Sequence, residues 1–132
     1  MELNNSVAMC YLKLKLYDKA TEAFERAMED NFDNSETFFY AAICRLRGKK
    51  AFLAQRADID KIEEYINAAL MIEPKGIYYY FLAYIKYDFF ERKYLNTSPN
   101  YQECVRMAYD LGTSDYDKKM LFNILGVALP NF

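Results

Sequence analysis

The residue types that could carry chemistry are few, and they form no complete catalytic set. The chain of 132 residues contains no histidine, which removes Ser-His-Asp and Cys-His nucleophilic sites and histidine-containing metal sites. The neighbouring carboxylates Glu63 and Glu64 diverge around a helix, so they suit solvent better than paired acid–base work. Four isolated glycines form no phosphate-binding loop. We therefore expect a protein that is not an enzyme and that binds no cofactor and no metal.

The three cysteines indicate packing rather than chemistry. Cys10, Cys44 and Cys104 show no Cys-x-x-Cys spacing, which argues against a zinc ribbon and a redox motif. Each lies in an apolar helical context, where a free thiol packs as a small hydrophobic group. Thiols used in this way favour a reducing compartment.

The ends and the apolar segments show no targeting or membrane signal. The first residues have neither a basic region nor an apolar region typical of a signal peptide. The most apolar stretch, 77–90, is interrupted by Lys86 and Asp88 and is shorter than the roughly 20 apolar residues of a membrane span. We expect a soluble, cytoplasmic protein without membrane insertion, or a domain of a longer protein whose targeting segment lies elsewhere.

Composition points to one folded domain over 1–132. Hydrophobic residues make up 53% of the chain and the net charge is only −2, so disorder is excluded. This balance also argues against a nucleic-acid partner, because a nucleic-acid binder should carry a basic surplus.

One charged cluster stands out between residues 45 and 56, where no acidic residue occurs. We call it the basic tip, because it falls at the end of a predicted helical hairpin; its members are Arg45, Arg47, Lys49, Lys50 and Arg56. Such a tip can hold a phosphate or an acidic segment. The alternative is an ordinary solvated hairpin end. The preceding segment 18–36 is rich in acidic residues.

The apolar spacing is helical throughout, with no sustained alternation of period two. Turn residues divide the chain into seven predicted helices, at 2–14, 17–30, 35–54, 58–72, 76–94, 99–112 and 115–129. Ser35 and Ser114 are the expected N-caps, with Asp58 and Ser98 as weaker candidates. Short connections between successive helices predict antiparallel hairpins.

Alternate helices share a pattern. In the second helix Ala20, Phe24 and Ala27 share one face, the fourth repeats this shape and ends at Pro74, and the sixth is a looser copy. The odd-numbered helices share a different spacing, clearest in Phe122, Leu125, Gly126 and Leu129 of the last.

This alternation resembles the tetratricopeptide repeat, whose first helix carries aromatic-x2-Leu-Gly-x2-Tyr and whose second carries Ala-x3-Phe-x2-Ala. The resemblance implies an all-α, right-handed α-solenoid of antiparallel helix pairs, with repeats at about 1–34, 35–76 and 77–118. The lone final helix, about 115–129, would be a capping half-repeat or the start of a longer array. The alternative fold is an irregular helical bundle.

The resemblance also implies a site, because the first helix of each repeat lines the concave face of such a solenoid. The groove positions carried over are Met9, Leu12, Lys13, Phe39, Ile43, Arg47, Tyr78, Phe81, Ile85 and Phe89, with Glu2, Asn5, Glu36, Leu46 and Asp88 on the same face. We call the first ten the predicted groove residues.

An aromatic groove of this kind would bind a protein partner as a peptide or an amphipathic helix, with the rings as anchors. The aromatic run 78–81 points in all directions around a helix, so one or two rings should escape the core. Two alternatives remain open: the rings could merely fill helix interfaces, or an open groove could be buried in a homodimer or a longer repeat array.

Overall fold

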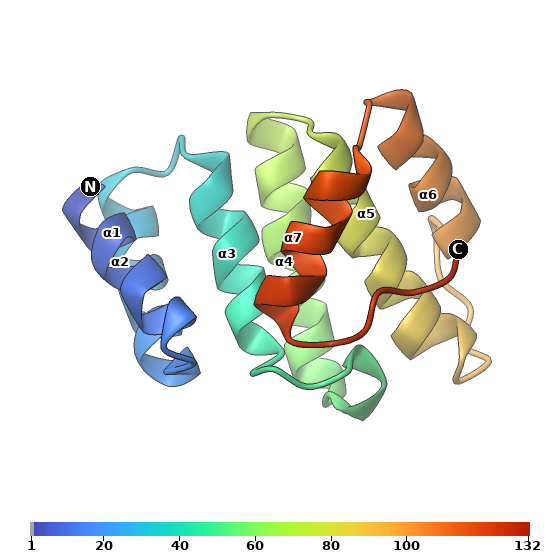
Figure 1. The fold of residues 1–132 in the computed structure, drawn as a ribbon, viewed down its shortest axis with the longest axis horizontal. Coiled ribbons are helices and arrows are strands. Elements are labelled where there is room, and N and C mark those ends of the chain that lie inside the picture. Colours follow the sequence, from blue (N-terminus) through green and yellow to red (C-terminus); the bar gives the residue numbers. More distant parts are fainter. Residues whose placement is uncertain (1) are drawn as a thin grey trace.

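The computed structural model describes residues 2–132, with the side chains from Asn5 onward (Figure 1). This part of the chain is entirely helical and contains no strand, which confirms the all-α prediction with seven helices. The helices are α1 (Glu2–Lys13), α2 (Tyr17–Asp30), α3 (Ser35–Arg45), α4 (Arg56–Ile72), α5 (Gly76–Ile85), α6 (Tyr101–Asp110) and α7 (Asp115–Leu125).

Side-chain caps define several helix starts. Ser114 caps α7 as predicted, in a reciprocal capping box with Asp117, because each side chain satisfies a backbone N–H of the other residue. The remaining three cap predictions were wrong, and in each case another residue precedes the helix. Asn34, Gln55 and Asn100 are the N-caps of α3, α4 and α6, in place of Ser35, Asp58 and Ser98.

The predicted helix 35–54 is shorter in the structure. Helix α3 ends at Arg45, and the chain then turns through Arg47 and Gly48, whose φ angles are 51° and 74°. A Cβ atom on Gly48 would lie 2.8 Å from the hydroxyl of Tyr17, so this turn also requires close approach to α2. A short 3₁₀ helix, η1 (Ala51–Leu53), follows before α4.

Two more helices end differently from the prediction. Helix α5 passes directly into a π-helix, η2 (Lys86–Glu91), marked by a bond from the Arg92 N–H to the Tyr87 carbonyl at 3.1 Å. Helix α7 ends at Leu125, because Gly126 adopts a left-handed conformation with φ 75°. Leu129 therefore lies beyond the last helix.

Packing follows chain order for the first six helices. The most extensive contacts join α1 to α2, α3 to α4, and α5 to α6, while α2 with α3 and α4 with α5 link these pairs. Alanines at the contacts, such as Ala23 and Ala27 of α2 and Ala41 of α3, are fully buried and let the helices approach closely.

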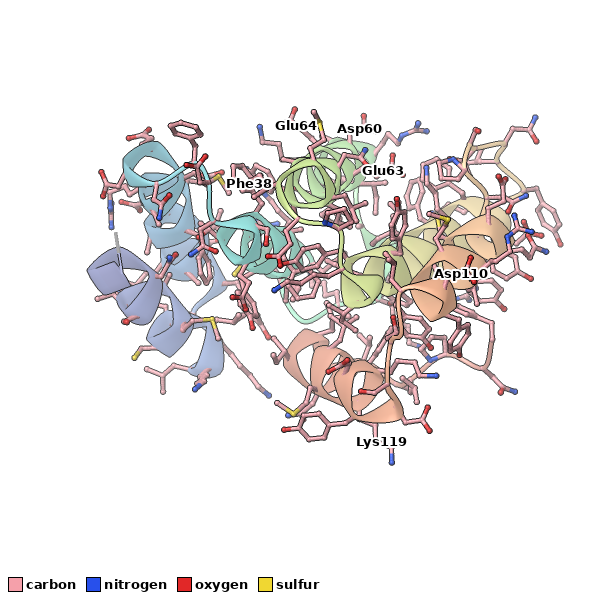
Figure 2. All side chains as sticks on the ribbon, turned by 90° about the horizontal axis from the view of Figure 1, so that it is seen from above. Phe38, Asp60, Glu63, Glu64, Asp110 and Lys119 are labelled. Carbon is pink, nitrogen blue, oxygen red and sulfur yellow. The ribbon has the colours of Figure 1, made fainter. Side chains whose placement is uncertain are left out.

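Helix α7 departs from this order. It contacts α5 and α3 and lies on the side of them that faces away from α4 (Figures 1 and 2). As a result α5 is enclosed by α4, α6 and α7, which explains why nearly all of its side chains are buried.

Candidate functional site

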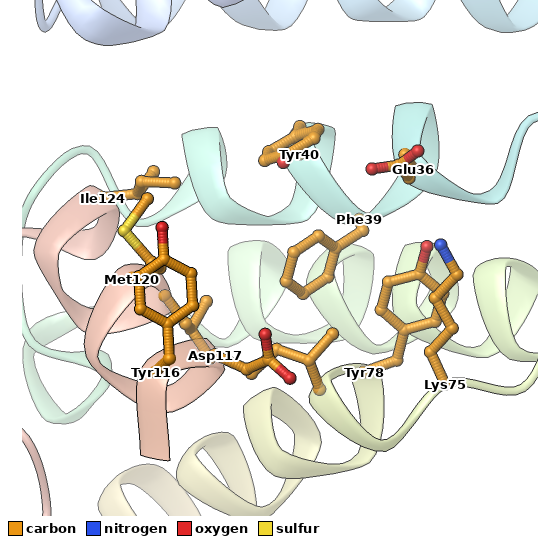
Figure 3. Close-up of a pocket in the computed structure, with 11 residues that line it drawn as sticks. Glu36, Phe39, Tyr40, Lys75, Tyr78, Tyr116, Asp117, Met120 and Ile124 are labelled. Atoms are coloured by element: carbon orange, nitrogen blue, oxygen red, sulfur yellow. The ribbon is translucent and has the colours of Figure 1, made fainter. Parts of the chain in front are cut away.

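A pocket of about 250 Å³ lies where α7 meets α3 and the start of α5 (Figure 3). We call it the α7 pocket. Helices α3 and α7 and the segment that begins α5 line it with Glu36, Phe39, Tyr40, Lys75, Ile77, Tyr78, Tyr116, Asp117, Met120, Leu121 and Ile124. Residues far apart in the sequence thus form one concave surface.

The floor of the α7 pocket is aromatic and fixed in place. The Phe39 ring lies 4.8 Å from that of Tyr78 and meets Phe81 edge-on at 5.8 Å, measured between ring centroids. The hydroxyls of Tyr78 and Ser35 are hydrogen-bonded at 2.8 Å, which ties α5 to the first residue of α3. Side chains held in this way form a preorganised surface for an apolar group.

The rim is charged and partly open to solvent. Glu36 and Asp117 supply two carboxylates and Lys75 one ammonium group (Figure 3). Beside them Tyr116 is 70% exposed and Met120 is 42% exposed. Such a site can bury an apolar side chain and place a charged group at its edge.

Two tyrosine hydroxyls of the α7 pocket, those of Tyr40 and Tyr78, remain protonated at neutral pH. Burial raises the pKa of Tyr78, and burial followed by the nearby Glu36 carboxylate raises the pKa of Tyr40. Both hydroxyls therefore can donate hydrogen bonds.

The predicted groove residues occupy several environments. Leu12, Phe39, Ile43, Tyr78, Phe81, Ile85 and Phe89 are buried, Met9 is half-buried, and Lys13 and Arg47 are exposed. Of these, Phe39 and Tyr78 line the α7 pocket. A second pocket, of about 260 Å³, brings Met9, Leu12 and Lys13 together with Asn123 and Ile124 of α7. The side chain of Glu2 lies outside the described residues.

Helix α7 thus borders both sets of predicted groove residues, and its Ile124 lines both pockets. One or two rings of the run 78–81 were expected to escape the core, and only Tyr79 does so in part. Tyr78, Tyr80 and Phe81 are buried and Tyr79 is half-buried, because neighbouring helices enclose α5.

Sequence reasoning singled out Phe122 as a packing position of the last helix, but it missed the rings that Phe122 contacts and the part played by Phe132. Phe122 of α7 meets the rings of Tyr80 and Tyr84 edge-on, with centroid distances of 6.0 and 5.0 Å. Phe132 packs against Tyr80, Tyr87 and Tyr101 at 5.7, 5.3 and 5.6 Å. The amphipathic spacing of 115–125 was the available signal, but it does not identify the surface that the helix covers.

Two arginines of the basic tip, Arg45 at the end of α3 and Arg47 just after it, are paired with acidic residues. Arg45 lies 3.0 Å from Glu25 and 3.6 Å from Asp58, and Arg47 lies 3.1 Å from Asp18 and 3.6 Å from Asp58. Two of these partners come from the acid-rich segment 18–36. The segment therefore supplies counter-charges to two of the five basic residues, Arg45 and Arg47.

The other members of the basic tip differ among themselves. Arg56 pairs with Asp60 at 3.0 Å. Lys49 and Lys50 are exposed, and neither forms an ion pair with the described residues. A phosphate bound here would compete with three carboxylates for the arginines, which favours the solvated hairpin end over an anion site.

Other site classes find no support in the described part of the chain. Among residues 2–132, no group of three or more His, Cys, Asp or Glu is placed to hold a metal ion. Over the same range, every helix falls short of the length and apolar character needed to cross a bilayer. In the comparisons with known proteins, no family model and no curated protein matches this chain.

Proposed function

We propose that the protein is a non-catalytic interaction module that binds a peptide or partner helix at the α7 pocket. The observation that carries this proposal is the pocket itself, a rigid aromatic floor with a charged rim, built by three helices. Concave sites with apolar linings and few polar groups are typical binding sites.

The lining indicates the chemistry of the ligand. The Phe39 and Tyr78 floor favours one large apolar side chain. The rim carboxylates of Glu36 and Asp117 outnumber Lys75, whose ammonium group also lies 3.8 Å from Glu73. We infer that a bound peptide places a Lys or Arg beside its apolar anchor.

We also propose that the first six helices form three tetratricopeptide-like hairpins, stacked as a right-handed solenoid and capped by α7. Two observations support this arrangement: the strongest contacts occur within successive helix pairs, and buried alanines line their interfaces. Buried free thiols at Cys44 and Cys104 favour a reducing compartment such as the cytoplasm.

The test is a selection of random peptides displayed on phage against the intact chain, followed by calorimetry on the synthetic peptides. We expect selected peptides to share an apolar residue next to a basic one. Met120→Lys should weaken their binding about tenfold or more, because it adds a positive charge to the rim that repels the basic residue of the peptide. Met107→Lys is the matched control, since Met107 is 40% exposed on α6 and lies outside the α7 pocket.

If Met120→Lys and Met107→Lys weaken peptide binding equally, the peptides bind outside the α7 pocket and the proposal is overturned.

Self-assembly is the alternative function, and it was inferred from a large exposed aromatic surface. The predicted groove rings are mostly buried in the single chain, so little exposed aromatic surface is left to drive self-assembly. Light scattering that shows a dimer at every concentration would support self-assembly instead.

A further inference from the structure

Helix α7 lies on α3 and α5 in the way that an amphipathic ligand helix occupies a groove. Its large apolar side chains Leu121, Phe122 and Leu125 are buried to within 3% exposure. Charged residues such as Asp115 and Lys119 are exposed, and Lys119 points away from the body of the protein (Figure 2). One face therefore supplies all of the attachment to these helices.

The attachment has a single aromatic centre. Phe122 enters between Tyr80 and Tyr84 of α5, and edge-on contact with both rings gives the site a preference for an aromatic side chain at this position. Tyr80 also contacts Phe132, so the segment after α7 ends on the same aromatic platform. The C-terminal segment is thus held at two points.

Polar contacts do little to lock α7 onto α3 and α5. Within residues 2–132, no hydrogen bond or ion pair joins α7 to either helix. The Lys118 ammonium donates to the Tyr109 hydroxyl of α6 at 2.8 Å and lies 5.4 Å from the ring centroid of Tyr80 in α5. Contacts of α7 with α3 and α5 are also less extensive than those within the helix pairs. Elements with few contacts open at a lower free-energy cost than the rest of a fold.

The two pockets beside α7 show that it does not fill the surface. The α7 pocket lies beside its first turns, the pocket lined by Met9 and Leu12 lies beside its last turn, and Ile124 lines both. Space therefore remains beside α7 on the side that faces α1 and α3.

We propose that α7 is a replaceable intramolecular ligand. The α3–α5 face would accept, from a partner protein, an amphipathic helix with Leu, Phe and Leu at the spacing of Leu121, Phe122 and Leu125. This inference rests on the proposed interaction function and names the partner's chemistry. Helix α7 competes with the partner within the same chain. The partner's apparent association constant therefore equals its intrinsic value multiplied by the fraction of chains in which α7 is detached.

The experiment offers the chain its own helix in trans. A fluorescein-labelled peptide of residues 113–132 is titrated with the full chain and read by anisotropy. The Phe122→Ala chain should bind this peptide at least about tenfold more tightly than the unmodified chain, because its own helix has lost the ring contacts. The peptide carrying the same substitution should bind neither chain. Lys119→Ala, on the outer side of α7, is the matched control and should behave as the unmodified chain.

Equal peptide binding by the unmodified and Phe122→Ala chains, with both folded by circular dichroism, would overturn the proposal. If the variant does not fold, hydrogen exchange of the unmodified chain decides. Amides of 116–125 should exchange at least about tenfold faster than those of 62–69 in α4, and equal rates would overturn the proposal.

The two proposals fail separately. One outcome is that the labelled peptide binds the Met120→Lys chain as it binds the unmodified chain, while no phage peptide binds the α7 pocket. That result would reject the α7 pocket as a binding site and retain helix exchange. If the phage peptides require Met120 and the labelled peptide does not bind in trans, helix exchange is rejected and the α7 pocket is retained.

Discussion

The Asp88 carboxylate accepts a hydrogen bond at 2.8 Å from the backbone N–H of Phe52, a residue 36 positions earlier in the chain. The same carboxylate pairs with Arg92 at 2.7 Å and accepts from the Tyr84 hydroxyl at 3.4 Å. The Tyr84 hydroxyl in turn accepts from the Ala51 N–H at 3.1 Å. The π-helix η2 thus anchors η1 and the connection between α3 and α4.

Asp88→Ala removes the centre of this network. We expect the free energy of unfolding to fall by about 1–3 kcal/mol, because the Phe52 N–H and the buried Tyr84 hydroxyl lose their acceptor. Urea denaturation followed by circular dichroism measures the change. Glu91→Ala is the control, since Glu91 is an exposed member of the same helix and its loss should cost less than about 0.5 kcal/mol. Equal costs for the two variants would show that the network contributes nothing.

Glu25 links three helices through one oxygen. Its Oε2 atom accepts from the Tyr65 hydroxyl at 2.6 Å and from Arg45 at 3.0 Å. Glu25→Ala should lower stability by about 1–2 kcal/mol, a range reduced for the 39% exposure of the carboxylate side chain. Glu22→Ala, which breaks the exposed pair with Arg26 on the same helix, should cost less than about 0.5 kcal/mol.

The Glu25 variant also carries a titration signature. Burial, followed by the bond to Glu25, raises the pKa of Tyr65 to about 12. Without Glu25, one raising influence is lost while Arg45 still favours the phenolate, so the pKa of Tyr65 should fall. NMR of labelled tyrosine rings between pH 9 and 12.5 would record this; an unchanged Tyr65 titration would contradict the role given to Glu25.

Gly76 sets the distance between α5 and the connection that leads to α7. A Cβ atom there would clash with the Thr113 hydroxyl and lie 2.7 Å from the Ala108 carbonyl oxygen. We expect Gly76→Ala to cost about 2–3 kcal/mol in thermal unfolding, because backbone must shift. Gly112→Ala meets no atom within 4 Å and should cost about 1 kcal/mol, from its positive φ of 83° alone. The opposite order would mean that the α6–α7 connection moves freely.

The thiols should fall into two reactivity classes. Cys10 is exposed, whereas Cys44 and Cys104 are buried, and burial raises the pKa of each buried thiol to about 12. At pH 8 the buried thiols therefore stay protonated and unreactive. Ellman's reagent should modify one thiol quickly and the other two only after unfolding in guanidinium. Rapid modification of two or more thiols in the native chain would contradict the packing of α3 or α6.

The number and order of helices were predictable because apolar spacing and turn residues act locally. Helix ends were less predictable where the helical spacing of apolar residues continues past the residue at which the helix ends. Residues 46–54 keep apolar groups such as Leu46 and Ala51, yet the positive φ angles of Arg47 and Gly48 end the helix. Helix propensity gave no sign of the close approach to Tyr17 that Gly48 permits.

The candidate site was predictable only in part. Phe39 and Tyr78 were expected on a concave face, and they do line the α7 pocket. The pocket's third wall comes from α7, whose amphipathic pattern predicts burial of one side but not the partner surface. The basic tip was predicted from charge alone, and the pairing of two of its arginines with Asp18, Glu25 and Asp58 depends on tertiary contacts.

The π-helix η2 also has a consequence for how residues along this segment are counted. A π-turn holds one more residue than an α-turn, so every side chain beyond it is rotated by about 100° relative to an uninterrupted α-helix. Positions 86–91 therefore behave as a one-residue insertion into α5. Deletion of one residue of η2 before Asp88 would turn Asp88 away from the Phe52 N–H, and the connection between α3 and α4 would then need another acceptor.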